Sequence, residues 1–241
     1  ANMATATRFS FEPHMIGDYV NGFAPMADAK VKVALAAATS AAVPGAFAPI
    51  ELKDVSLPCR GVDTVSLLDG GAYDNTGIEV LNSRELDDVR TICLAAGGIF
   101  KVGGYMKAPV IRDLKQANSV LYRQSRALRT RDMVQRFKDP NSNRRGSVFK
   151  LNTSRDDVEE PLKRRKDQEA LDRVAAFVAA YQDINEYKGE ELAFVPTSFD
   201  KFEEGLSRRL IYKAWWTTGL TMVAFNDDLP GPSAGTTPPP V

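Results

Sequence analysis

The spacing of hydrophobic and polar residues changes along the chain, and each kind of spacing predicts a strand or a helix. Two short apolar runs, "VSLL" at 65–68 and "TICLAA" at 91–96, are stopped by glycines, as is typical of buried strands. Between them, Thr76 to about Val89 has a helical pattern. A strand, a helix and a strand at this spacing predict a parallel α/β sheet.

Helical patterns recur in four other segments. Lys30 to about Ala42 is apolar nearly all round, which predicts a buried helix. Arg112–Lys138 is the longest pattern and has an apolar stripe between basic positions. Asp167–Tyr181 predicts an amphipathic helix, and Phe199–Phe225 predicts one or two further helices. The expected fold class is therefore α/β with a mainly parallel sheet and a helical C-terminal region.

The remaining segments show neither the strand-like nor the helical spacing of hydrophobic residues. Residues 1–29 predict loops and short strands, and Arg155–Lys166 carries mixed charges that predict an exposed, mobile connection. Leu229–Val241 consists mainly of Pro, Gly and Thr, which predicts a disordered tail because almost nothing in it can be buried. We therefore expect one domain portion over 1–225 and a tail over 226–241.

The uncharged stretch Val33–Ile50 could be mistaken for a membrane span. Pro44 and Pro49 interrupt it, so a buried helix ending near Val43 is the better interpretation, and we predict no transmembrane span. The N-terminus has no basic stretch followed by an apolar one, which argues against a signal peptide. Two cysteines in a chain of 241 residues make no disulfide framework, so a cytoplasmic location is predicted.

The net and local charges of the chain limit the classes of partner that it is expected to bind. The formal net charge is zero, and no nucleic-acid partner is predicted. The segment from Lys107 to Lys150 is locally basic, with twelve Lys and Arg against three Asp. It fits either a peripheral contact with anionic lipid headgroups or a solvated helix face, and the solvated face is the preferred interpretation.

The composition also limits the kinds of metal and binding site that the chain can form. The single histidine, His14, excludes a multi-histidine metal site and is expected to be a surface or packing residue. Asp69, Asp74 and Asn75 do not have the spacing of an EF-hand-type loop, so neither a metal nor a cofactor is predicted. Near the C-terminus, Trp215 and Trp216 fit core packing or an acyl-chain groove, and core packing is preferred.

Asp69 is the main candidate for chemistry. It follows the predicted strand "VSLL", and reactive groups of open α/β sheets lie beyond the carboxyl ends of strands. Gly70 and Gly71 allow a tight turn and the close approach of another segment. Asp69 could then orient or deprotonate a nucleophile, or it could simply cap the following turn. Asn75 is predicted to cap the helix that follows.

Two stretches extend this motif: "ALAAATSAAVPGAFAPIEL" upstream and "LLDGGAYDNTGIEVL" around Asp69. Together they resemble the patatin-like phospholipase family, whose members carry a small-residue helix before a D-G-G/A motif and an Asn that starts the next helix. "ANMATATRFSFEPHMIGDY" and "QSRALRTRDMVQRF" continue the resemblance, and "LSRRLIYKAWWTTG" does so weakly. It covers about residues 1–225.

The resemblance implies a partial three-layer α/β/α domain and a lipid acyl hydrolase with a Ser-Asp dyad. Asp69 takes the dyad position, Gly70 and Gly71 complete the motif, and Asn75 supports the site. The expected partner is a lipid or another acyl ester, and no cofactor is needed.

The chain differs from the family's pattern at the segment that would carry the nucleophile. Neither the glycine-rich oxyanion loop nor the G-x-S-x-G elbow appears before residue 30, so we expect this chain alone to be inactive. The literal match around Ser233 follows Pro232 and precedes a proline run, which does not suit a strand-to-helix elbow. The alternative hypothesis is a non-catalytic lipid- or protein-binding module on the same scaffold.

Overall fold

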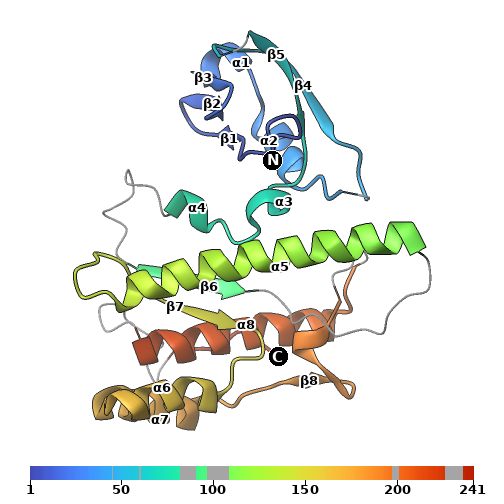
Figure 1. Cartoon of the computed structure of the whole chain (residues 1–241). Helices are drawn as coiled ribbons and strands as arrows, with labels where there is room; N and C mark the ends of the chain where they lie inside the picture. The colour runs from blue at the N-terminus through green and yellow to red at the C-terminus, as the bar shows by residue number, and fades with distance from the viewer. Residues whose placement is uncertain (45, 60, 82–90, 97–108, 197–200, 226–235) are drawn as a thin grey trace. The chain divides into compact units, whose positions relative to one another are not determined.

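The computed structural model describes residues 1–44, 46–59, 61–81, 91–96, 109–196, 201–225 and 236–241 (Figure 1). Its contacts divide the chain into two compact units. The N-terminal unit comprises Ala1–Val80 and Ala117–Ala127, and the C-terminal unit comprises Leu81–Gln116 and Leu128–Val241. The sequence predicts one domain portion over 1–225, whereas the contacts gather in these two units.

The N-terminal unit begins with an antiparallel sheet of β1 (Ser10–Phe11), β2 (Met15–Asp18) and β3 (Gly22–Pro25), which confirms the short strands expected in 1–29. Asp18 fixes the turn between β2 and β3. Its buried carboxylate accepts hydrogen bonds from the backbone N–H groups of Val20 and Asn21 and from the side-chain amides of Asn2 and Asn21. A buried carboxylate needs such partners, and these tie the first residues of the chain to the turn.

The strand predicted at 65–68 is the end of β5 (Val62–Leu67), which pairs antiparallel with β4 (Ile50–Leu57). Residues 1–3 lie along the other edge of β5, where the Met3 N–H donates to the Ser66 carbonyl at 2.9 Å. The expectation that 65–68 and 91–96 belong to one parallel sheet is therefore wrong, because the two segments lie in different sheets. Both edges of β5 have antiparallel partners, and strand pairing depends on distant residues that local periodicity does not encode.

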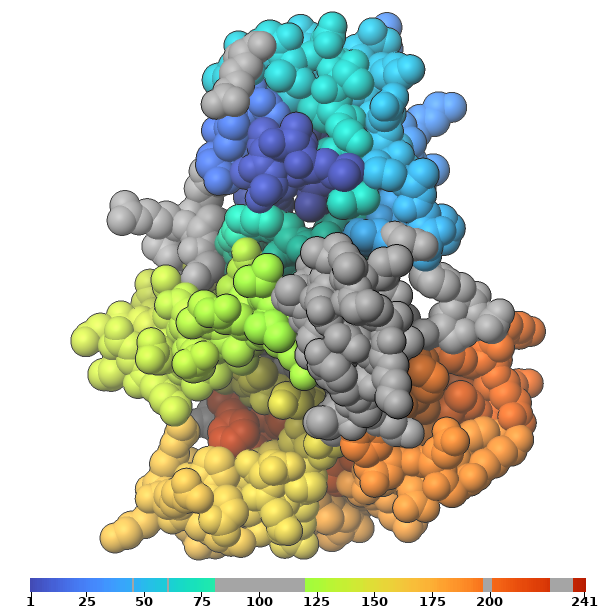
Figure 2. All heavy atoms as spheres, turned by 45° about the vertical axis from the view of Figure 1, so that its right-hand side comes forward, coloured from blue at the N-terminus to red at the C-terminus, as the bar shows by residue number. Residues whose placement is uncertain are grey.

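The helix predicted from Lys30 to Ala42 is wrong in its extent and burial. α1 (Met26–Ala29) ends before it, and α2 (Val33–Ser40) is only eight residues long. Thr39 is the buried residue of α2, whereas Val33 is 86% exposed. Figure 2 shows this light-blue part of the chain at the surface. Apolar composition correctly indicates a helix, but burial requires a covering element, which composition does not supply.

Parallel pairing does occur in the C-terminal unit, between β6 (Thr91–Ala96) and β7 (Arg145–Lys150), in register from Thr91 opposite Arg145 to Ala96 opposite Lys150. The chain between them contains α5 (Pro109–Lys138), so the long helix predicted over 112–138 is confirmed. Its predicted apolar stripe is only partly buried, because Met133 is covered while Leu121 and Leu128 are exposed.

The mixed α/β class is confirmed in general terms. The strands that the structure describes form one three-stranded and three two-stranded sheets, of which the β6–β7 pair is parallel. The last of these sheets is the small hairpin of β8 (Glu186–Tyr187) and β9 (Glu190–Glu191). In the N-terminal unit, α3 (Gly71–Asp74) and α4 (Ile78–Leu81) follow β5; of the helix predicted over 76–89, residues 82–90 lie outside the described part.

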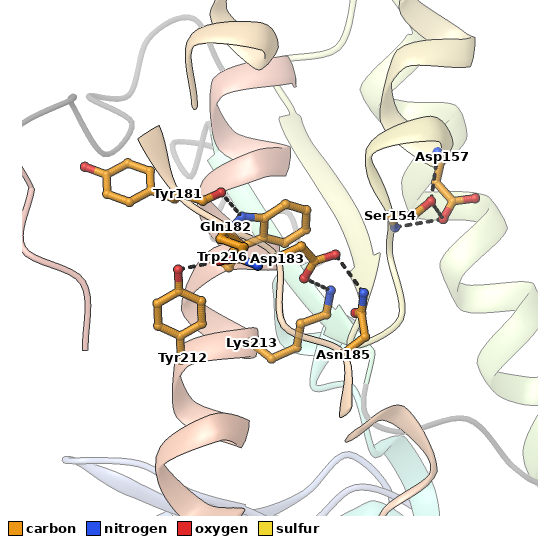
Figure 3. A network of polar contacts seen from close by, with 9 residues as sticks. All are labelled: Ser154, Asp157, Tyr181, Gln182, Asp183, Asn185, Tyr212, Lys213 and Trp216. Atoms are coloured by element: carbon orange, nitrogen blue, oxygen red, sulfur yellow. Dashed lines mark hydrogen bonds and ion pairs between the residues drawn. The ribbon is translucent and has the colours of Figure 1, made fainter. Parts of the chain in front are cut away.

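The mobile connection predicted over 155–166 is wrong, because these residues form α6 (Arg155–Arg165). Ser154 and Asp157 make a reciprocal capping box at its start (Figure 3), and Val158 and Leu162 bury one face. Val158 and Leu162 are four residues apart, and that spacing is a helical signal. The prediction of a connection rested instead on the charged residues at the other positions.

Helices α7 (Gln168–Ala180) and α8 (Glu204–Phe225) confirm the two helical predictions near the C-terminus and pack against each other. Their core includes Phe177, Leu220 and Trp216, whose indole N–H donates to the Tyr181 carbonyl at 2.9 Å. The preferred core role of the tryptophans is thus confirmed, with Trp215 partly buried against the same cluster.

Near the C-terminus, residues 226–235 of the predicted tail, including Ser233, lie outside the described residues. Residues 236–241 have neither helix nor strand, and the Thr236 carbonyl accepts a hydrogen bond from the Tyr181 hydroxyl. None of the helices in the described part of the chain is long and apolar enough to cross a bilayer.

Candidate functional site

The turn after β5 places Asp69 in the N-terminal unit. The Asp69 N–H donates to the Ala42 carbonyl at 3.0 Å, and the Gly70 N–H donates to the Ser40 carbonyl at 3.2 Å. The turn thus satisfies two backbone carbonyls at the end of α2, which would otherwise lack partners. These bonds hold Asp69, which is half-buried, beside the exposed apolar helix.

The two carboxylate oxygens of Asp69 have different surroundings. Oδ1 accepts a 2.5 Å hydrogen bond from the Gly71 N–H, and the Asp69 carbonyl accepts one from Ala72 at 3.1 Å. Asp69 therefore caps the first turn of α3, as one of the two interpretations of the sequence expects. Oδ2 has no hydrogen-bond partner among the described residues, which leaves one oxygen for other chemistry.

Gly70 and Gly71 have different steric surroundings. A Cβ at Gly71 would lie 2.7 Å from Asp69 Oδ1 and 2.8 Å from Asn75 Oδ1, closer than real carbon–oxygen contacts allow. A Cβ at Gly70 would meet only the Ser40 Oγ, at an ordinary 3.4 Å. Gly71 is therefore the position where the missing side chain lets two polar side chains gather over the backbone.

The prediction that Asn75 caps the next helix is wrong. Asp74 makes those contacts instead: its Oδ1 accepts from the Thr76 N–H and hydroxyl, and its Oδ2 accepts from the Glu79 N–H at 2.9 Å. Asn75 has helical dihedral angles and ends α3, so its side chain turns back toward Gly71. Two adjacent Asx residues offer equally good caps in the sequence, and only the backbone geometry distinguishes them.

Tyr122, which was not among the predicted site residues, is brought near this turn by α5. Tyr122 belongs to the part of α5 that lies in the N-terminal unit, near Asp69, Asp74 and Asn75. Burial raises the pKa of Tyr122, Arg126 and Asn75 oppose that rise, and the charges of Asp69 and Asp74 add to it. No local signal links Tyr122 to a motif so far away in the chain.

The site contains no complete nucleophile–base pair among the described residues. Ser40 is the serine near Gly70, and it makes no hydrogen bond to Asp69. His14 is exposed, as expected for a surface residue. The described residues contain no group of three or more potential His, Cys, Asp or Glu metal ligands.

A second polar cluster, in the C-terminal unit, surrounds a buried lysine (Figure 3). The side chain of Lys213 is 1% exposed, lies 4.5 Å above the Trp216 ring, and donates to Asp183 Oδ1 at 2.6 Å. Burial lowers the pKa of Lys213, and its hydrogen bond to Asp183 opposes this effect.

Neighbours of Lys213 hold the same segment of chain. The Tyr212 hydroxyl donates to the Gln182 carbonyl at 2.9 Å, and Asn185 donates to the other oxygen of Asp183 at 3.1 Å. Together with the hydrogen bond of Trp216 to the Tyr181 carbonyl, these contacts hold the segment that follows α7 against α8. Because its ammonium group is covered, Lys213 has a structural role rather than that of an accessible nucleophile.

Comparisons of the chain with protein-family models, with curated proteins and with solved structures find no match. The case for a function therefore depends on the residues and geometry of the chain itself. Asp69 lies beside the apolar helix α2, and its Oδ2 accepts no hydrogen bond from the described residues, so it is the best candidate for chemistry among them.

Proposed function

We propose that this chain is the part of a lipid acyl hydrolase, on a patatin-like α/β/α scaffold, that carries the acidic member of a Ser-Asp dyad. The carrying observation is the asymmetry of Asp69: the Gly71 N–H holds Oδ1 at 2.5 Å, while Oδ2 has no described partner. A fixed carboxylate with one free oxygen can orient a serine hydroxyl and accept its proton.

In the proposed reaction, Asp69 Oδ2 accepts the serine proton as the serine oxygen attacks the ester carbonyl. The carbon–oxygen bond to the leaving alcohol breaks, and the alcohol leaves with the proton held by Asp69. Water then attacks the acyl-serine, giving a proton to Asp69, and the free acid forms as that proton returns to serine. The serine and the oxyanion donors come from a segment other than the described residues.

The surroundings of Asp69 support a lipid substrate. α2 ends at the Asp69 turn and exposes Val33 and Leu35, while Phe47 is exposed shortly beyond it. Apolar surface beside a reactive carboxylate suits an acyl chain. The proposal includes a cytoplasmic location with peripheral contact at a membrane, to which the basic stretch between Lys107 and Lys150 could add attraction for anionic headgroups.

The test uses the polypeptide encoded by the complete source reading frame and measures hydrolysis of short-chain esters and phospholipid vesicles. We expect Asp69→Asn to lower kcat by about 10²- to 10⁴-fold, the usual contribution of a general base. Asp63→Asn is the matched control, because Asp63 is exposed on β5, the strand that leads to Asp69, and it should leave kcat unchanged. Wild-type turnover by Asp69→Asn would remove Asp69 from the mechanism.

The alternative is a non-catalytic binding module, which the capping contact of Asp69 with Gly71 favours, since a carboxylate that caps a turn needs no further role. In that case the complete polypeptide would bind anionic vesicles without hydrolysing them, and Asp69→Asn would not alter binding. Vesicle sedimentation alongside the hydrolysis assay separates the two functions.

A further inference from the structure

The N-terminal unit has an exposed, uncharged surface on α2 and the loop that follows it. It is formed by residues 33–44 and 46–49, and we call it the α2 surface (Figure 2). Ala36, Thr39 and Ala42 are buried or half-buried, and the other residues of this surface are exposed. Val33 is 86% exposed and Phe47 is 53% exposed. Apolar side chains exposed together in this way mark an interaction site.

The exposed positions of α2 are not confined to one stripe. With about 3.6 residues per turn, they cover more than half of the helix circumference. These positions are Val33, Ala34, Leu35, Ala37, Ala38 and Ser40. A folded partner contacts one stripe of a surface helix, whereas acyl chains move to surround it. The exposure of α2 therefore fits a fluid lipid phase better than the surface of a protein.

Two lysines stand at the start of the α2 surface. Lys30 and Lys32 directly precede α2, both are exposed, and no acidic residue occurs between Asp28 and Glu51. Lys32 is the N-cap residue of α2, where the helix dipole disfavours a cation. Among the described residues, neither lysine has an acidic partner. Their charge is therefore better explained by an anion outside the chain, and it complements anionic lipid headgroups.

We propose that the α2 surface docks on a lipid bilayer that contains anionic headgroups. Val33, Leu35 and Phe47 enter the acyl-chain boundary, and Lys30 and Lys32 stay at the level of the headgroups. The inference deepens the proposed function by naming the surface that contacts the membrane, and it rests on that function for the delivery of a lipid substrate.

Backbone hydrogen bonds connect the α2 surface to the Asp69 turn. The Gly70 N–H donates to the Ser40 carbonyl at 3.2 Å, and the Asp69 N–H donates to the Ala42 carbonyl at 3.0 Å. Ser40 ends α2, and Ala42 follows it by two residues. Docking of the α2 surface thus holds the Asp69 turn close to the membrane, where a lipid ester lies.

The first test measures binding and needs no activity. The polypeptide of the complete source reading frame is sedimented with phosphatidylcholine vesicles and with vesicles of phosphatidylcholine and phosphatidylserine in equal parts. Val33→Glu should weaken binding to the anionic vesicles about tenfold or more, because an apolar contact is lost and a buried charge is costly. Ile211→Glu is the matched control, because Ile211 is 58% exposed on α8 in the other unit, and it should bind as the wild type does. Unchanged binding by Val33→Glu would overturn the proposal.

The lysines are tested by the double variant Lys30→Gln, Lys32→Gln. It should weaken binding to the anionic vesicles about tenfold or more and leave binding to pure phosphatidylcholine unchanged, because the charges act only on anionic headgroups. Leu121→Glu tests the competing basic segment, since Leu121 is 64% exposed on α5. Binding that Leu121→Glu abolishes and the α2 variants retain would assign the contact to α5 and overturn the proposal.

Two further measurements exclude other occupants of the α2 surface. Val33→Glu should leave the thermal midpoint of the complete polypeptide unchanged, because the position is exposed and a carboxylate suits a helix N-terminus. A lowered midpoint would show that another segment covers α2. Light scattering should find the same mass for the wild type and Val33→Glu. A dimer that this variant dissociates would assign the surface to a second copy, and either result would overturn the membrane proposal.

Hydrolysis separates this inference from the proposed function. In an active wild type, Val33→Glu should keep the turnover of a soluble short-chain ester and lose about tenfold in the turnover of phospholipid in anionic vesicles. Equal turnover of vesicle phospholipid by Val33→Glu and the wild type would overturn the role of docking. If the wild type binds anionic vesicles through α2 and hydrolyses no ester, the docking inference stands and the proposed function fails.

Discussion

At the scale of single residues, Gly71 shows how a missing side chain builds a site. Asp69 and Asn75 come together only because nothing projects from the backbone between them. Gly70, one residue earlier, has helical φ and ψ angles of −60° and −31° that any residue can adopt. The two glycines of the motif are therefore not equivalent, although they are identical in sequence.

This difference predicts opposite effects of alanine at the two positions. Gly71→Ala should destabilise the protein by about 1 kcal/mol, the low end of the cost of overpacking, because the side-chain oxygens of Asp69 and Asn75 must shift away from the new Cβ. Gly70→Ala should be neutral or stabilising by up to about 1 kcal/mol, because it restricts the unfolded chain and its Cβ makes only an ordinary contact. Urea unfolding of both variants measures the effects, and equal midpoints would contradict the steric argument.

Glu159 provides a pH-dependent prediction at the same scale. Its side chain is 10% exposed and pairs with Lys163 at 2.9 Å and with Arg155 on the preceding turn. Hydrogen bonds from Lys163 and Arg155 lower the pKa of Glu159 below its ordinary 4.5. The stabilisation is thus present above pH 4.5 and is lost as the pH falls through the lower folded-state value.

Glu159→Gln should therefore cost about 1 kcal/mol at pH 7 and progressively less as the medium becomes acidic. Denaturant unfolding across pH 3–7 (roughly the range over which carboxylates titrate) measures this. Glu160→Gln is the control, because Glu160 is 58% exposed and its pair with Arg164 is long, at 3.7 Å. A loss of stability that does not vary with pH would show that the charge of Glu159 is not its source.

At the scale of elements, α8 fastens the chain that follows α7. Tyr212 and Lys213 are adjacent in α8, and Trp216 lies about one turn further along. They reach Gln182, Asp183 and Tyr181 respectively (Figure 3). Burial is unequal across the ion pair, since Lys213 is 1% exposed and Asp183 is 24% exposed. The cost of removing one partner should therefore depend on which partner remains.

Asp183→Asn leaves a buried ammonium without its carboxylate and should cost about 3–5 kcal/mol. Lys213→Met should cost less, because Asp183 keeps Asn185 and contact with solvent. Thermal or urea unfolding measures both variants. A larger loss for Lys213→Met would show that packing of the lysine stem over Trp216, rather than the charge, dominates.

The pH dependence of this pair has the same sign as that of Glu159, but it lies in the alkaline rather than the acidic range. Burial lowers the pKa of Lys213 below its ordinary 10.5, so the unfolded chain binds the proton more readily than the folded chain. The stability of the wild type relative to Lys213→Met should therefore rise as the pH increases toward 10.5. A difference that falls over this range would contradict the assigned direction.

At the scale of the whole molecule, two hydrophobic cores stabilise the two units. One core gathers the strands of the N-terminal unit and contains Ile16 and Leu67, which are fully buried. The other joins α6, α7 and α8 around Val174 and Leu220. The two sets of buried residues have no member in common.

Substitutions in the two cores should therefore act on different parts of the chain. Leu67→Ala and Leu220→Ala should each cost about 2–5 kcal/mol locally. In hydrogen–deuterium exchange, Leu67→Ala should deprotect β4 and β5 most, and Leu220→Ala should deprotect α7 and α8 most. Uniform deprotection by either variant would instead show that the chain unfolds as one cooperative unit.

Local patterns predicted the elements whose information is local. The helix α5, the amphipathic pattern of α7 and the β-branched run of β5 all form as expected, because periodicity and propensity act over a few residues. The helix α6 was also encoded locally, in the spacing of Ser154 and Asp157 and of Val158 and Leu162. The many charged residues of α6 led instead to the prediction of an exposed connection.

The sequence by itself determined that Asp69 follows a strand and that two glycines come directly after it, because these are properties of neighbouring residues. Only the tertiary structure decided that β5 pairs antiparallel with β4, that α2 stays exposed, and that the Trp216 indole N–H reaches the Tyr181 carbonyl. Each of these depends on residues far apart in the chain, whose contacts are selected by the packing of the folded molecule and leave no local pattern.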